Sequence, residues 1–179
     1  MLVTPTVRLL AYTPNPEILV AQAASLCYSK EGFKEDLSLE EARKLIRVIP
    51  RKHKSILEHV SWTFLVTGIS RACSHEMVRH RHLSFSQRSQ RYVDEQNASF
   101  SVPARLIQIM GEEVVKQILN QFQVAYRAAL EAYAAEGIVG EEANQDARYF
   151  LPNATETIKT ATGNGSGLLN FFNLRMCHR

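Results

Sequence analysis

The most informative segment of this chain is Arg79-His80-Arg81-His82-Leu83-Ser84-Phe85-Ser86-Gln87-Arg88-Ser89-Gln90-Arg91. It contains four arginines, two histidines and three serines. Arginine presents a rigid fork of donors that fits phosphate and carboxylate oxygens two at a time. Serine hydroxyls and glutamine amides between the arginines would hold the uncharged part of the same ligand. The segment therefore predicts a pocket for an anionic ligand.

A solvated basic face is the simpler interpretation of such an arginine run. Against it, Leu83 and Phe85 interrupt the run, so the backbone has to bury and expose side chains alternately. A nucleic-acid-binding protein could use the segment as a backbone clamp, but the net charge of the whole chain is only +3. That modest charge argues against a nucleic-acid partner. The bound anion is therefore favoured, with the solvated face as the alternative.

The neighbouring histidines raise the possibility of a metal hydrolase. His75, His80 and His82 stand near Glu76, but the zinc protease pattern needs a histidine where Arg79 stands. A dication among several guanidinium groups would also be repelled. We therefore expect no metal, and stoichiometric zinc in the purified protein would favour the hydrolase instead.

The bulk composition is typical of one globular domain. The chain has 179 residues, 45% of them hydrophobic and 22% charged, so we expect a single domain over residues 1–179. Three cysteines without paired spacing predict reduced thiols in the cytoplasm. The apolar runs are too short to span a bilayer and the N-terminus lacks signal-peptide features, so no membrane partner is expected.

The hydrophobic pattern predicts a few strands and several helices. Strands are expected at residues 3–12 and 60–68. Helices are expected at 16–27, 39–49, from Ser70, at 112–136 after an opening at Pro103, from about 141, and at 168–175, with residues 162–167 as a loop. The helix at 112–136 is expected to bury Val115, Ile118 and Phe122. Because strands and helices do not alternate strictly, we expect an α+β fold with an antiparallel sheet.

Two further groups of polar residues could touch a ligand. Ser55 and Glu58 precede the second strand and could contact a ribose or phosphate, although a turn cap and a surface ion pair explain them equally well. A second group surrounds the glycines near the C-terminus, where the backbone can approach a ligand closely. It comprises Asn164, Gly165, Ser166, Asn170 and Arg175. Here the alternative is a plain helix start with Ser166 as its cap.

The pattern Arg79-His80-Arg81-x-x-Ser84-x-x-x-x-Ser89-x-Arg91 resembles the signature of the flavin-dependent thymidylate synthases at each fixed position. The resemblance extends to blocks at 53–59, 146–152 and 164–175, and so covers nearly the whole chain. Glu76, Gln87, Ser166 and Arg179 depart from the pattern of some relatives. The chain also looks shortened at its C-terminus relative to the family.

The resemblance implies a homotetramer of α+β subunits, with active sites between subunits. Each site would hold FAD, dUMP and a folate. The implied reaction is the reductive methylation of dUMP to dTMP. In this reaction 5,10-methylenetetrahydrofolate supplies the carbon and NADPH reduces the tightly bound FAD.

The resemblance also implies roles for individual residues. Arg175 would be catalytic, lying against the pyrimidine and stabilising the anion at N3. The residues implied for dUMP are Glu76, Arg79, Gln87, Arg88, Ser89, Gln90, Arg91, Arg148 and Arg175. Those implied for FAD are Ser55, Glu58, Arg79, His80, Arg81, Gln87, Asn164, Gly165, Ser166 and Asn170. His53 would lie on the folate or nicotinamide side.

Overall fold

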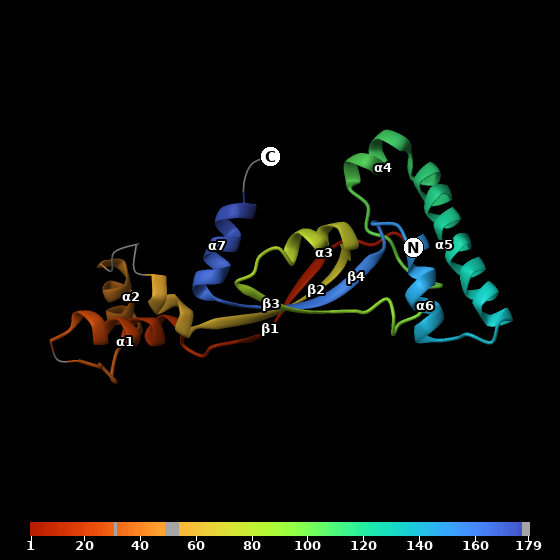
Figure 1. Ribbon diagram of the computed structural model, residues 1–179. Coiled ribbons are helices and arrows are strands. Elements are labelled where there is room, and N and C mark those ends of the chain that lie inside the picture. Colours follow the sequence, from red (N-terminus) through yellow and green to blue (C-terminus); the bar gives the residue numbers. More distant parts are fainter. Residues whose placement is uncertain (31, 49–53, 177–179) are drawn as a thin grey trace. The chain divides into compact units, whose positions relative to one another are not determined.

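The computed structural model describes residues 1–30, 32–48 and 54–176 and has an α+β fold (Figure 1). The strands are β1 (Thr6–Tyr12), β2 (Ser61–Ser70), β3 (Leu83–Gln87) and β4 (Glu156–Asn164). The α-helices are α1 (Pro16–Tyr28), α2 (Leu39–Val48), α3 (Arg71–Met77), α4 (Ala104–Met110), α5 (Glu112–Ala135), α6 (Glu141–Ala147) and α7 (Gly165–Arg175). Two 3-10 helices are η1 (Lys54–His59) and η2 (Arg148–Phe150). No helix in the described ranges has the length and apolarity needed to cross a membrane.

The strands form one sheet in the order β1-β2-β4-β3. Neighbouring strands run antiparallel, as expected. The start of β1 meets the end of β2, where the hydroxyls of Thr6 and Thr67 are 2.6 Å apart. Beyond the other end of β1, the backbone N–H of Thr13 donates to Ser61 O at 3.0 Å. The partition of the chain into two compact units divides each of these strands.

The first unit comprises residues 1–7, 66–79 and 86–159. Its core contains Phe100, Val115 and Leu119, with Leu2 and Val102 packed against them. Within this unit α5 contacts α4, α6 and η2. The segment 86–95 belongs to the same unit as α5 and α6.

The second unit comprises the described parts of residues 8–65, 80–85 and 160–179. Its core contains Val20, Ala24, Ile56 and Val60, from α1, η1 and the start of β2. Within this unit α1 contacts α2 and η1, and α7 contacts η1. The second unit therefore has a hydrophobic core of its own, built from α1, η1 and the start of β2.

Local sequence signals mark the starts of several helices. Ser38 and Glu41 form the capping box of α2: Ser38 N–H donates to Glu41 Oε2 at 2.9 Å, and Glu41 N–H donates to Ser38 Oγ at 3.3 Å. The Ser70 hydroxyl caps α3 by accepting the N–H of Cys73 at 3.1 Å. Helix α1 begins at Pro16, although the Asn15 side chain forms no capping hydrogen bond.

Other expectations were wrong. Residues 162–167 are not a loop, because β4 continues to Asn164 and α7 begins at once at Gly165. Strands β3 and β4 were not expected as strands. Helix α5 buries Val115, Leu119 and Tyr126, whereas Ile118 and Phe122 are exposed, so its buried face is rotated from the expected one.

Candidate functional site

The arginine segment leaves β3 with the Arg88 guanidinium beside a buried carboxylate. Arg88 Nε is 3.4 Å from Glu95 Oε1, and Glu95 is only 2% exposed. Burial raises the pKa of Glu95, and the positive charges of Arg88 and Arg71 oppose that rise. Glu95 was not predicted, because nothing in its local sequence pattern marks it as a partner of arginine.

Two more arginines of the first unit lie within electrostatic range of this pair. Arg71 Nη1 donates to Arg88 O at 3.3 Å and to Thr157 Oγ1 at 3.4 Å. Burial lowers the pKa of Arg71; Glu95 opposes that shift and the charge of Arg148 adds to it. Arg88 and Arg71 therefore act on one buried carboxylate, with Arg148 near Arg71, and the negative charges of Asp94 and Glu156 also act on Glu95.

Arg91 is paired within the protein. Its Nη2 donates to Glu141 Oε1 at the start of α6, and its guanidinium carbon lies 5.6 Å from the centre of the Tyr92 ring. Its backbone N–H donates to Ser89 Oγ at 3.2 Å. Its Nε is buried with no hydrogen-bond partner among the described residues. The Nη2 of Arg91 is therefore fixed by Glu141, while its Nε–H has no acceptor in the described part of the chain.

The remaining residues predicted for dUMP lie near the end of α3 and on the loop after β3. Arg79 N–H donates to Glu76 O at 3.3 Å, and the side chains of both residues are exposed. Gln87 Oε1 accepts from the Ser74 hydroxyl at 2.5 Å, and Gln90 is 8% exposed. The first unit therefore contains every residue predicted for dUMP except Arg175.

A buried lysine adjoins this group and was not predicted. Lys159 of β4 is 1% exposed, and its Nζ donates to Ser74 O at 3.3 Å. Burial lowers the pKa of Lys159, and the positive charge of Arg71 acts in the same direction. Lys159 thus contacts the backbone of Ser74, the residue whose hydroxyl orients Gln87.

In the second unit, α7 and its N-cap carry four of the residues predicted for FAD, which are Asn164, Gly165, Ser166 and Asn170. Asn164 is its N-cap: Asn164 Oδ1 accepts the N–H of Gly167 at 2.8 Å, so the cap is not Ser166. A Cβ on Gly165 would lie 2.8 Å from Leu57 O, which explains why glycine is needed there. Ser166 is half-buried and Asn170 is exposed.

The predicted catalytic residue, Arg175, lies at the end of α7 and contacts a histidine of the signature. Arg175 Nε donates to His80 Nε2 at 2.8 Å. The His80 ring is buried and packs edge-on against Phe171, with ring centres 4.8 Å apart. Because Nε2 accepts in this contact, the His80 ring is not protonated at that nitrogen.

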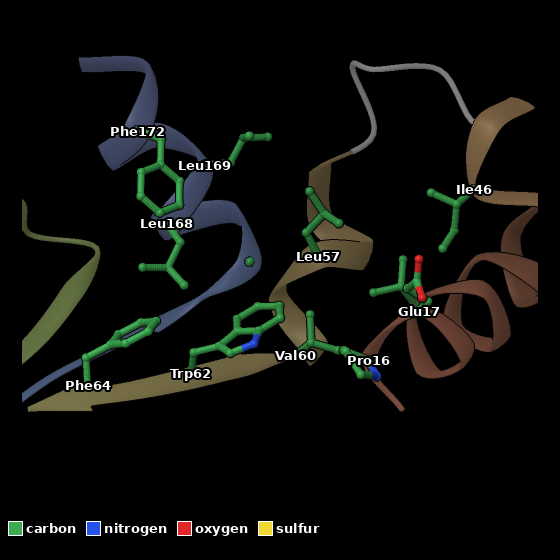
Figure 2. Close-up of a pocket in the computed structure, with 12 residues that line it drawn as sticks. Pro16, Glu17, Ile46, Leu57, Val60, Trp62, Phe64, Leu168, Leu169 and Phe172 are labelled. Carbon is green, nitrogen blue, oxygen red and sulfur yellow. The ribbon is translucent and has the colours of Figure 1, made fainter. Parts of the chain in front are cut away.

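The second unit also contains a largely apolar pocket of about 490 Å³ (Figure 2). Trp62 and Phe64 project from β2 toward it, Leu168 and Phe172 reach it from α7, and Leu57 reaches it from η1 (Figure 2). Gly165 also lines it. Its other lining residues are Pro16, Glu17, Val20, Ile46, Val60 and Leu169.

Some predicted residues remain outside this arrangement. Ser55 and Glu58 are exposed on η1, the short helix that places Leu57 in the pocket, and Arg81 is exposed in the turn before β3. His53 and Arg179 lie outside the described residues. Among residues 1–30, 32–48 and 54–176, no group of three or more His, Cys, Asp and Glu residues is placed to hold a metal ion.

Comparison with known proteins gives the family. The family model described as thymidylate synthase complementing protein matches residues 8–179. A flavin-dependent thymidylate synthase of Clostridium tetani is 41% identical over 97% of this chain and 75% of the relative. One of Geobacter sulfurreducens is 41% identical over 97% of this chain and 74% of the relative.

This chain belongs to the flavin-dependent thymidylate synthase family. Solved structures agree. A UMP/dUMP methylase, PolB of Streptomyces cacaoi, bound with 5-Br dUMP, has a TM-score of 0.75 at 28% identity, over 99% of this chain and 80% of that one. Thymidylate synthase X of Helicobacter pylori, solved with FAD and dUMP, shares the fold, with a TM-score of 0.73 at 23% identity, over 97% of this chain and 85% of that one.

Proposed function

We propose that this chain, as a flavin-dependent thymidylate synthase, methylates dUMP reductively to dTMP, with its nucleotide site in the arginine segment of the first unit. The observation that supports this most is the group of arginines gathered at the signature: Arg88 lies beside Glu95, Arg71 lies within electrostatic range of Glu95, and Arg148 lies within range of Arg71. Guanidinium groups gathered in this way stabilise a bound dianion, because each fork can pair with two phosphate oxygens. Polar groups of the same unit would hold the uracil and ribose.

Within that site, we propose that Arg91 offers the phosphate its unpartnered Nε–H. Ser89, Gln90, Arg88, Arg79 and Arg148 complete the predicted set, with Gln87 reading the base edge and Glu76 beside them. Gln87 is already oriented by the Ser74 hydroxyl, so its amide group has little freedom left to lose on binding.

The second unit fits FAD. Its apolar pocket offers aromatic and aliphatic surface for planar rings, and Gly165 lines that pocket. Ser55 and Glu58 on η1, and Asn164, Ser166 and Asn170 on α7, carry polar groups for the ribose and diphosphate. Arg79, His80, Arg81 and Gln87 are also proposed for FAD. When bound, FAD supplies the reducing equivalents that NADPH delivers.

Arg175 is the proposed catalytic residue. Uracil C5 becomes nucleophilic when negative charge develops on the ring, and a fixed guanidinium near N3 stabilises that charge. Removing one such preorganised donor typically costs about 3 kcal/mol of transition-state stabilisation. In the structure Arg175 Nε donates to His80 Nε2, and this contact holds the guanidinium at the end of α7.

The remaining proposals concern partners. We propose that 5,10-methylenetetrahydrofolate and NADPH are co-substrates, that His53 lies on their side, and that neither nucleic acid nor a membrane is a partner. We also propose a cytoplasmic homotetramer with active sites between subunits. Four copies of the 20.3 kDa chain would give about 81 kDa in light scattering, and a persistent 20 kDa species would contradict the tetramer.

The test of the function compares the wild-type protein with Arg175→Ala. With FAD, dUMP, methylenetetrahydrofolate and NADPH supplied, the wild type forms dTMP. The variant is expected to lose at least about a hundredfold in rate while retaining FAD, because a transition-state donor is removed and the flavin residues remain. Equal dTMP formation by both proteins would exclude the role of Arg175, and none by the wild type would refute the proposed function.

A further inference from the structure

Two buried side chains hold the backbone directly after the signature. The hydroxyl of Tyr126, on α5, accepts the backbone N–H of Glu95 at 3.2 Å. The side-chain amide of Asn144, on α6, donates to the backbone carbonyl of Arg91 at 3.1 Å. Side chains of α5 and α6 therefore form hydrogen bonds to the backbone at the two ends of the segment 91–95.

The side chains of Tyr126 and Asn144 also lie within hydrogen-bond distance of each other. The Tyr126 hydroxyl lies 3.4 Å from Asn144 Oδ1 and 3.5 Å from Asp94 Oδ1, and it can donate to either oxygen while accepting from Glu95. Burial raises the pKa of Tyr126, so its hydroxyl keeps the proton needed for that donation. When Tyr126 donates to Asn144, one polarised chain of groups runs from Glu95 N–H through Tyr126 and Asn144 to Arg91 O.

The side chains of Tyr126 and Asn144 are both buried. Tyr126 is 0% exposed and Asn144 is 6% exposed, so water cannot readily replace a lost partner. The held segment begins at Arg91 and ends at Glu95, whose carboxylate pairs with Arg88. Fixing the backbone at both ends therefore fixes the Cα positions of Arg91 and Glu95. The charges of these two side chains, with that of Arg88, act on the predicted phosphate site.

We propose that Tyr126 and Asn144 form a single positioning clamp for nucleotide binding, which holds residues 91–95 so that Ser89, Arg88 and Arg91 are preorganised for a nucleoside monophosphate. This inference rests on the proposed function, because the ligand is the proposed substrate. The clamp touches no ligand and acts through the backbone. Its loss costs nucleotide affinity because the loop then has to be ordered on binding.

The experiment uses Tyr126→Phe, Asn144→Ala and the double variant in the full chain loaded with FAD. Phenylalanine keeps the buried ring and removes only the hydroxyl. Tyr133→Phe is the matched control, because Tyr133 lies on the same helix and its hydroxyl bonds instead to Asp146 at 2.6 Å. Asn144→Asp serves as a second variant if the alanine protein does not fold, since it keeps an oxygen toward Tyr126 and loses the donor to Arg91.

Each single variant is expected to raise the KM for dUMP about tenfold, with kcat within about twofold and FAD affinity unchanged. Because the two side chains act as one unit, the double variant should also lose about tenfold, where independent sites would lose about a hundredfold. Amide hydrogen exchange at Glu95 should accelerate in Tyr126→Phe and not in Tyr133→Phe.

An unchanged KM for dUMP in Tyr126→Phe, or a fully additive double variant, would overturn the clamp while leaving the proposed function intact. A parallel loss of FAD affinity would also overturn it, because that result indicates general destabilisation. If the wild type failed to bind dUMP, the proposed function would fall, and the role of the clamp in nucleotide binding would fall with it. Exchange at Glu95 would then report only on the backbone contact itself.

Discussion

At the scale of single residues, Glu95 controls the charge of the predicted nucleotide site. Its carboxylate is buried beside Arg88 and within range of Arg71. Burial raises its pKa above the ordinary value of 4.5, so the native state holds this proton more tightly than the unfolded chain does. Its contribution to stability is therefore complete below about pH 4.5 and is lost as the pH rises through the folded-state pKa.

Glu95→Gln is expected to remove this pH dependence. Relative to the variant, the free energy of unfolding of the wild type should decrease as the pH rises from 4.5 toward neutrality. Urea unfolding at a series of pH values measures the difference, with Glu136→Gln at the exposed end of α5 as the control. Parallel stability curves for the wild type and Glu95→Gln would show that burial does not perturb this carboxyl.

Residue types were easier to predict than their partners. The arginines of the signature follow from the sequence, because no core needs so many guanidinium groups. Their acidic partners do not follow, since Arg91 pairs with Glu141, which lies 50 residues later, and only the packing of α6 brings them together. Tyr126 and Asn144 were not predicted for the same reason, because their contacts with residues 91–95 also cross long sequence separations.

At the scale of elements, helices were predicted better than strands. Capping signals at Ser38 and Ser70 mark helix starts locally. Strand β4 escaped notice because its buried positions are Thr157, Lys159, Ala161 and Gly163, which give no hydrophobic alternation. A strand whose buried face is polar cannot be recognised by a pattern that assumes an apolar one.

Gly68 of β2 provides a test at this scale. Its φ is +68°, and an added Cβ would lie 2.1 Å from Thr4 O. Gly137 is the matched control, with a φ of +78° and open space around the added Cβ. Gly137→Ala should lower the free energy of unfolding by about 1 kcal/mol through backbone strain alone. Gly68→Ala should lower it by about 3 kcal/mol or more, because the backbone near Thr4 must also shift.

Thermal and urea unfolding of the two alanine variants measures this difference. Equal destabilisation of the two variants would contradict the close approach of Thr4 to β2. It would mean that the left-handed conformation alone accounts for glycine at position 68.

At the scale of the whole molecule, the α+β class and the antiparallel sheet were predictable, and the division into two compact units was not. Each unit has its own core, around Phe100 in one and Val60 in the other. The residues predicted for dUMP fall in the first unit, apart from Arg175, and most of those predicted for FAD fall in the second. Sequence motifs identify residues that bind ligands. They do not predict the division into two units, because that division depends on tertiary packing.

Exposed apolar side chains also support the proposed assembly. No residue of β1 is buried, and Leu9, Leu10 and Tyr12 are each more than 40% exposed. An unpaired apolar edge of this kind is a liability for a monomer, since it can pair with other chains. Coverage by other subunits would remove that liability.

The most direct test of the account is the absorbance spectrum of the purified protein loaded with FAD, recorded with and without dUMP. We expect flavin bands in the protein, and a saturable change in those bands on titration with dUMP, because the proposed reaction passes reducing equivalents from the flavin to the nucleotide. A protein that takes up neither FAD nor dUMP, or flavin bands that do not respond to dUMP at any concentration, would contradict the central claim.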